Sequence, residues 1–166
     1  MKIDPLTVEW SPEQTVVMQT LHDWAVSSAE LNQHLAAWLS LPSSDANALG
    51  HIIWSAEEGR PLSPADLSRR IGMTTGATTV LLHRLERAGH IRRSREHTDR
   101  RRVTLRPEAA TRERARAFIA AAGTEIAQVI LSTPTEELRR VTAFVARLTA
   151  ASEEAKKRLQ NSETGG

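Results

Sequence analysis

Apolar residues recur at helical spacing in the first part of the chain. Ser11 and Pro12 suit the start of a helix that runs to Leu39. Steps of four and three residues alternate along its apolar seam, which consists of Val17, Leu21, Trp24, Ser28, Leu31, Leu35 and Trp38. This heptad spacing indicates packing on a partner helix, and burial within one domain is the alternative.

Three shorter helices are predicted next, over residues 46–56, 64–71 and 75–88. Ser63 and Asp66 form an S-x-x-D capping box before the second helix, and Thr74 caps the third. Glycines suited to helix ends follow the three helices at positions 59, 72 and 89.

The remaining chain combines a hairpin with two helices. An arginine-rich turn containing Thr98 and Asp99 divides residues 91–105 into two short stretches that suit edge strands. Helices are expected over 108–131 and 136–159, and the second carries heptad-like spacing at Leu138, Val141, Val145 and Leu148.

Composition narrows the class of protein. A chain of 166 residues with 40% hydrophobic side chains can bury one sizeable core, so a single domain over 1–166 is expected. It has no cysteine, which excludes disulfides and thiol chemistry. No apolar run is long enough to cross a membrane, and we expect a soluble, cytoplasmic protein.

Positive charge is concentrated in one segment. Residues 92–106 contain seven arginines and two acidic residues, a net charge of +5, which leaves −3 for the rest of the chain. Two short helices followed at once by such a basic hairpin are typical of a winged helix-turn-helix. The sequence therefore predicts a mainly α fold with a DNA-binding lobe over 42–106 and a helical dimerisation region from 11–40 and 108–159.

The same stretches carry a resemblance to the multiple-antibiotic-resistance regulator (MarR) family. The motif residues are Leu62 to Leu67, Ile71-Gly72, Gly76 to Thr79, Arg84 to Gly89, and Asp99-Arg100-Arg101 with Val103 and Leu105. The resemblance implies a homodimer paired through the first and last helices. Ser68, Thr78 and Arg106 depart from the family pattern, where alanine, valine and a helix-capping threonine are usual.

The predicted recognition helix offers two kinds of DNA contact. Thr74, Thr75 and the following backbone N–H groups lie at a helix N-terminus, which favours phosphate. Thr75, Thr79 and His83 share one face that can meet base edges, and an ordinary polar surface is the alternative. Gly76 would let the duplex approach closely. For Arg84, phosphate contact and pairing with an internal acidic group are both open.

In the wing, the resemblance makes Arg101 the residue that enters the minor groove, where a narrow A·T-rich tract concentrates negative potential. Asp99 would be repelled by phosphates, so we expect it to orient a neighbouring guanidinium. Arg95, Arg100 and Arg102 contact phosphate or remain solvated.

The resemblance also implies a small aromatic or phenolic effector, and Trp38, His51 and Trp54 lie where its cleft would form; a core position is the alternative for the tryptophans. We expect a sequence-specific regulator of transcription that binds a pseudo-palindromic double-stranded DNA site, most simply as a repressor released by this ligand. A helical dimeric interaction module without specific DNA binding is the alternative. The six histidines show no metal-ligand spacing, so neither an enzyme nor a cofactor is expected.

Overall fold

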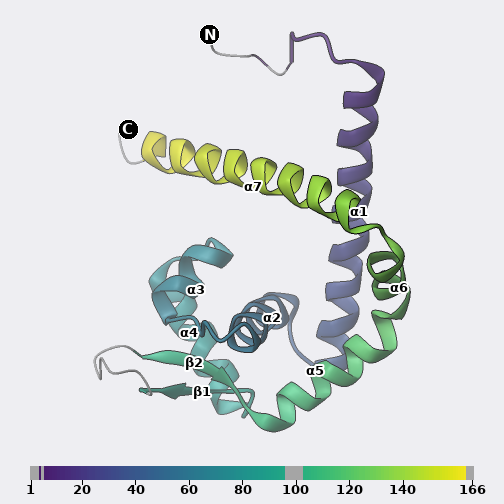
Figure 1. Cartoon of the computed structure of the whole chain (residues 1–166). Helices are drawn as coiled ribbons and strands as arrows, with labels where there is room; N and C mark the ends of the chain where they lie inside the picture. Colours follow the sequence, from purple (N-terminus) through teal and green to yellow (C-terminus); the bar gives the residue numbers. More distant parts are fainter. Residues whose placement is uncertain (1–3, 5, 96–102, 164–166) are drawn as a thin grey trace. The chain divides into compact units, whose positions relative to one another are not determined.

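A computed structural model describes residues 4, 6–95 and 103–163, and residues 1–122 and 123–166 form two compact units. In chain order the elements are α1 (Pro12–Leu39), α2 (Ser43–Glu57), α3 (Pro64–Ile71), α4 (Thr75–Arg87), β1 (Ile91–Ser94), β2 (Thr104–Pro107), α5 (Ala109–Ala122), α6 (Thr124–Ser132) and α7 (Thr135–Glu163) (Figure 1).

Helix α1 has the bounds that its sequence predicts. The Ser11 side chain accepts from the N–H of Gln14, and the Gln14 side chain accepts from the N–H of Ser11 at 2.9 Å, which satisfies two donors at the helix start. The seam is not uniform along its length. Trp24 is 55% exposed, whereas Leu35 packs against the core formed by the following helices. One end of the seam therefore belongs to this core, and Trp24 in the other half lies outside it.

Helices α2, α3 and α4 and the β1–β2 hairpin enclose that core, with α2 at its centre (Figure 1). Its buried members are Leu39, Ala48, Leu49, Ile52, Leu62, Leu67, Leu81, Leu82, Leu85, Ile91 and Leu105. The hairpin is antiparallel, and the Leu105 N–H donates to the Leu62 carbonyl at 2.8 Å along the outer edge of β2. This arrangement confirms the predicted winged helix-turn-helix, and we refer to it below as the lobe.

Ser68, one of the three residues that depart from the family pattern, stabilises the turn between α3 and α4. The Ser68 hydroxyl donates to the Met73 carbonyl at 2.6 Å, and Gly72 adopts the left-handed conformation (φ 67°) that ends α3. Thr74 then caps α4 by accepting from the Ala77 N–H. Serine in place of alanine therefore supplies a hydrogen bond that alanine could not make.

Thr78, a second departure, is only 2% exposed, and its hydroxyl has no hydrogen-bond partner among the described residues. Thr78→Val is expected to stabilise the protein by about 1 kcal/mol, because the isosteric change removes a buried, unsatisfied hydroxyl. Urea unfolding monitored by tryptophan fluorescence measures the change. Thr104→Val is the matched control, because the buried Thr104 hydroxyl donates to the Ser94 carbonyl and its loss should destabilise. A Thr78→Val variant less stable than the parent would contradict the interpretation that the buried Thr78 hydroxyl destabilises the protein.

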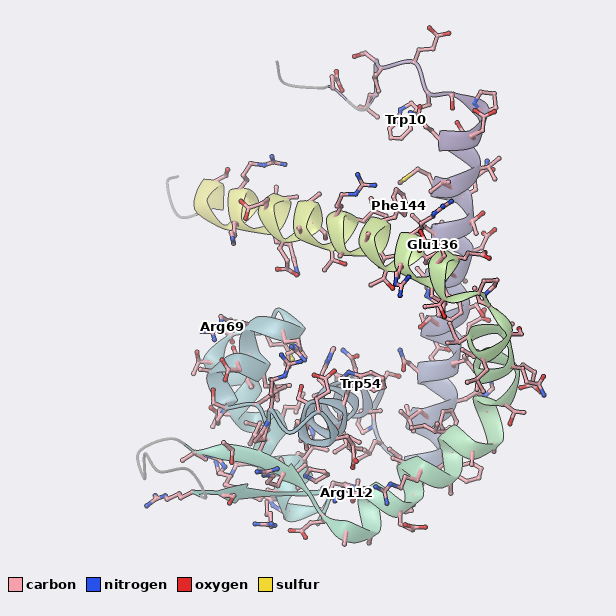
Figure 2. The ribbon with its side chains drawn as sticks, in the orientation of Figure 1. Trp10, Trp54, Arg69, Arg112, Glu136 and Phe144 are labelled. Carbon is pink, nitrogen blue, oxygen red and sulfur yellow. The ribbon has the colours of Figure 1, made fainter. Side chains whose placement is uncertain are left out.

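Two ion pairs connect helix α5 to the lobe. Arg112 and Arg116, one helical turn apart, both contact the Glu57 carboxylate at the end of α2, at 3.0 and 3.5 Å (Figure 2 labels Arg112). At the end of α1, the Trp38 ring lies edge-on to Phe118 of α5, with ring centroids 6.0 Å apart. Helix α5 therefore contacts both α1 and the lobe.

The predicted continuous helix over 108–131 is wrong. The chain breaks at Gly123, which separates α5 from α6. Glycine is one of the weakest helix formers, and a run of apolar residues on both sides does not compensate for it here.

The second unit is rich in apolar side chains, yet none is buried among the residues of 123–163 whose burial is described. Val129, Ile130 and Leu131 of α6 are between 53% and 84% exposed, and Val141 of α7 is 52% exposed. Arg147 lies over the Phe144 ring. Within the described residues, no single helix is long and apolar enough to span a membrane; α5 and α6 reach that length only together, across their break.

Candidate nucleic-acid interface

Helix α4 separates a buried side from a polar side. Leu81, Leu82 and Leu85 are at most 1% exposed and pack in the lobe core. Thr79 and His83 are exposed, as is Thr75. Core packing therefore directs these polar residues to solvent, as the spacing predicts. The Thr79 hydroxyl donates to the Thr75 carbonyl at 2.8 Å, so in this conformation it can offer a base edge only an acceptor.

The N-terminus of α4 is open to solvent. Thr74, Thr75 and Gly76 are all exposed, and a Cβ built on Gly76 would meet nothing within 4 Å. Gly76 has no left-handed backbone conformation, so nothing in the lobe requires glycine at this position. Its small size leaves room for close approach of another molecule to the first backbone N–H groups of the helix.

Arg84 pairs with a buried carboxylate, one of the two roles that the sequence leaves open. Asp45, in the first turn of α2, is 1% exposed and accepts from Arg84 Nε at 2.7 Å and from Arg84 Nη2 at 2.5 Å. The hydrogen bond and charge of Asp45 raise the pKa of Arg84 above its ordinary value. The Arg84 side chain remains 53% exposed, so the ion pair does not close off its outer edge.

The base of the wing carries exposed arginines. Arg93 contacts Glu86 of α4 at 3.4 Å, which connects β1 to α4, and Arg95 is exposed just beyond β1. Arg106, the third family departure, is half-buried and lies opposite Arg92 in the hairpin. The remaining predicted wing residues, Asp99, Arg100, Arg101 and Arg102, lie outside the described residues.

The predicted effector residues lie on α1 and α2. Trp38 is 49% exposed and Trp54 is 66% exposed, so the alternative that the tryptophans belong to the core is wrong (Figure 2 labels Trp54). His51 is half-buried; burial, followed by the nearby Arg70, lowers its pKa. Arg70 of α3 also donates to the buried Ser55 hydroxyl at 3.0 Å. An effector site at these residues stays a prediction.

Comparison with known proteins shows that this lobe is similar to HTH-type transcriptional regulators. Residues 47–103 match the MarR family. The "Uncharacterized HTH-type transcriptional regulator YcgE" of Bacillus subtilis (strain 168) is 29% identical over 103 residues, which are 62% of this chain and 67% of that protein. The "HTH-type transcriptional regulator TtmR" of Methylorubrum extorquens (strain PA1) is 41% identical over 54 residues, which are 32% of this chain and 26% of that protein.

A solved structure has a similar fold over most of the chain. The MepR protein of S. aureus in its DNA-binding conformation superimposes with a TM-score of 0.63 at 16% identity, over 81% of this chain and 97% of that chain. The fold of this chain is therefore a winged helix-turn-helix, and the relatives that it resembles are HTH-type transcriptional regulators. The match of residues 47–103 to the MarR family confirms the resemblance seen in the motifs.

Proposed function

We propose that this protein binds a specific double-stranded DNA sequence as a homodimer and so regulates transcription. The observation that carries the proposal is helix α4, whose buried leucines fix an exposed Thr75/Thr79/His83 face directly before a hairpin rich in arginine. Such a helix can enter the major groove while the hairpin meets the flanking backbone and minor groove. The exposed N-terminus of α4 supports phosphate contacts by Thr74, Thr75 and Gly76.

Exposed apolar surface supports the homodimer. The first half of α1, α6 and part of α7 present large apolar side chains, including Trp24, Ile130 and Phe144. Uncovered apolar surface of this extent marks an interaction site, and a second copy with the same surface can cover it. A two-fold dimer would present its recognition helices about one turn of DNA apart, to a pseudo-palindromic site.

Selection of binding sites from random duplexes, followed by footprinting on the selected sequence, tests the proposal. We expect two related half-sites, both protected. Protection of a single asymmetric half-site, or no enrichment of any sequence, would contradict it.

The further parts of the proposal concern regulation. We propose a cytoplasmic repressor that a small aromatic or phenolic ligand releases from DNA, with Trp38, His51 and Trp54 near the ligand. Two exposed tryptophans and a half-buried histidine suit an aromatic compound. The lobe over 42–106 would supply DNA contacts, and 11–40 with 108–159 would supply dimer contacts.

Substitutions in the proposed recognition helix and in the wing are expected to have different effects on DNA binding. His83→Ala and Thr79→Ala are expected to change the preference among half-site variants, by roughly 1–3 kcal/mol for each base edge that the side chain no longer reads. Arg101→Ala should instead lose affinity mainly where A·T pairs flank the half-site, because it reads groove width, and Asp99→Ala should act similarly but more weakly. Affinities measured on duplexes that differ only in half-site or only in flank separate the two roles. A shift of half-site preference in Arg101→Ala but not in His83→Ala would reverse the assignment.

A further inference from the structure

Asp45 is the only charged residue among the buried residues that the structure describes. Its carboxylate accepts three hydrogen bonds, two from Arg84 and one from the Ser44 hydroxyl at 3.1 Å. A buried carboxylate without such partners would be strongly destabilising. Arg84 is therefore held by a partner that has little freedom to move.

The geometry of the pair fixes the direction of the guanidinium. Arg84 uses its Nε and Nη2 edge to bind both carboxylate oxygens, which is the side-on, two-point arrangement that orients a planar group. The N–H groups of Nη1 are not part of this fork. Because the side chain is 53% exposed, this opposite edge is available to a second acceptor.

The position of Arg84 on α4 indicates what the outer, Nη1 edge of its guanidinium can contact. Arg84 follows His83 directly, so the fixed guanidinium lies about 100° around the helix from a predicted base-contacting side chain. Contacts to DNA phosphates set the register in which such side chains meet the bases. An arginine fixed at its inner edge loses less conformational freedom on binding than a mobile one.

We propose that Asp45 is a positioning residue, which holds Arg84 so that its outer edge binds one DNA phosphate beside the recognition helix. The inference rests on the proposed function. Asp45 neutralises much of the charge of Arg84, so the contact contributes chiefly to register and little to general attraction for DNA. Disturbing the pair should therefore reduce discrimination between sequences more than it reduces binding to any duplex.

The test compares two 30-base-pair duplexes, one selected by the wild-type protein from random sequence and one with the same bases scrambled. Asp45→Asn is nearly isosteric and removes the charge. We expect the ratio of affinities for the two duplexes to fall about tenfold or more, with affinity for the scrambled duplex equal or higher, because each subunit gains a positive charge. Arg84→Lys keeps the charge but cannot make the two-point arrangement, and it should lower the ratio to a similar extent with an unchanged salt dependence.

Glu58→Gln is the matched control. It makes the same change of charge in an exposed pair, where Glu58 contacts Arg60 at 2.9 Å, and it should leave the ratio unchanged within about twofold. Thermal unfolding verifies that each variant folds, and Arg84→Lys decides the question if Asp45→Asn does not fold.

Folded variants that keep the wild-type ratio, or that lose affinity equally for both duplexes, would overturn the positioning role and leave the proposed function intact. A wild-type protein that shows no preference between the duplexes would overturn the proposed function and this inference together.

Discussion

Trp24→Glu is expected to convert the protein to a monomer and to abolish tight DNA binding. Trp24 is 55% exposed, in the half of the α1 seam that lies outside the lobe core. In a symmetric dimer each substitution occurs twice, and each removes a large apolar side chain from the interface and buries a charge. These changes predict a dimer dissociation constant raised on the order of 10³-fold or more. Light scattering at micromolar concentration measures the mass, and a footprint measures DNA binding.

The position of the substitution in α1 determines whether the experiment tests the dimer interface or the stability of the lobe. Glutamate at both Leu31 and Leu35 should also dissociate or unfold the dimer, but Leu35 packs against the lobe core, so that pair would damage the lobe itself. Gln19→Glu, exposed on the same helix and outside the seam, adds the same charge and should remain dimeric. A Trp24→Glu protein that is folded and still dimeric would exclude this half of α1 from the interface.

Affinity for DNA is expected to fall by a factor of about 10³ to 10⁵ between 50 and 200 mM salt, as for proteins that make roughly 6 to 10 phosphate contacts. Each subunit of the proposed dimer has seven arginines between residues 92 and 106 and one open N-terminus of α4, so the dimer would have twice these groups. Each phosphate that they neutralise releases counterions from the duplex. Titration of a fluorescent duplex at several salt concentrations gives the slope.

A pair of substitutions makes the salt experiment specific to the wing. Arg95→Gln should reduce the slope of log affinity against log salt by about two for a dimer, since each phosphate that is no longer neutralised accounts for about 0.9. Arg60→Gln removes the same charge from an exposed arginine of the α2–α3 loop that pairs with Glu58, and it should leave the slope nearly unchanged. Equal slopes for both variants would place the attraction outside the wing, and a slope near zero in the parent protein would remove its electrostatic basis.

The sequence predicts most accurately those features that nearby residues determine. Ser11, Ser63 and Thr74 each begin a helix where a cap is expected, because a cap depends on groups within three residues of each other. The exposed face of α4 follows in the same way from the spacing of its leucines and threonines. The hairpin is also correct, with β2 extending to Pro107, beyond the expected end at Leu105.

The predictions from sequence are wrong or incomplete where contacts between residues far apart in the chain determine the structure. The break at Gly123 opposes an apolar pattern that runs on through it, and only packing determines which of the two effects prevails. The ion pair of Arg84 with Asp45 joins residues 39 positions apart, and no local pattern names an aspartate as the partner of this arginine. Likewise, exposed tryptophans cannot be distinguished from core tryptophans by spacing within one helix, because burial depends on which other elements cover them.

The shared carboxylate of Glu57 has a mechanical consequence. Since Arg112 and Arg116 contact it from successive turns of α5, a large slide or rotation of the start of α5 on α2 would separate these charges. Helix α2 in turn carries Asp45, which accepts hydrogen bonds from Arg84 of α4. A movement of α5 relative to α4 would therefore have to break or shift ion pairs at one or both ends of α2.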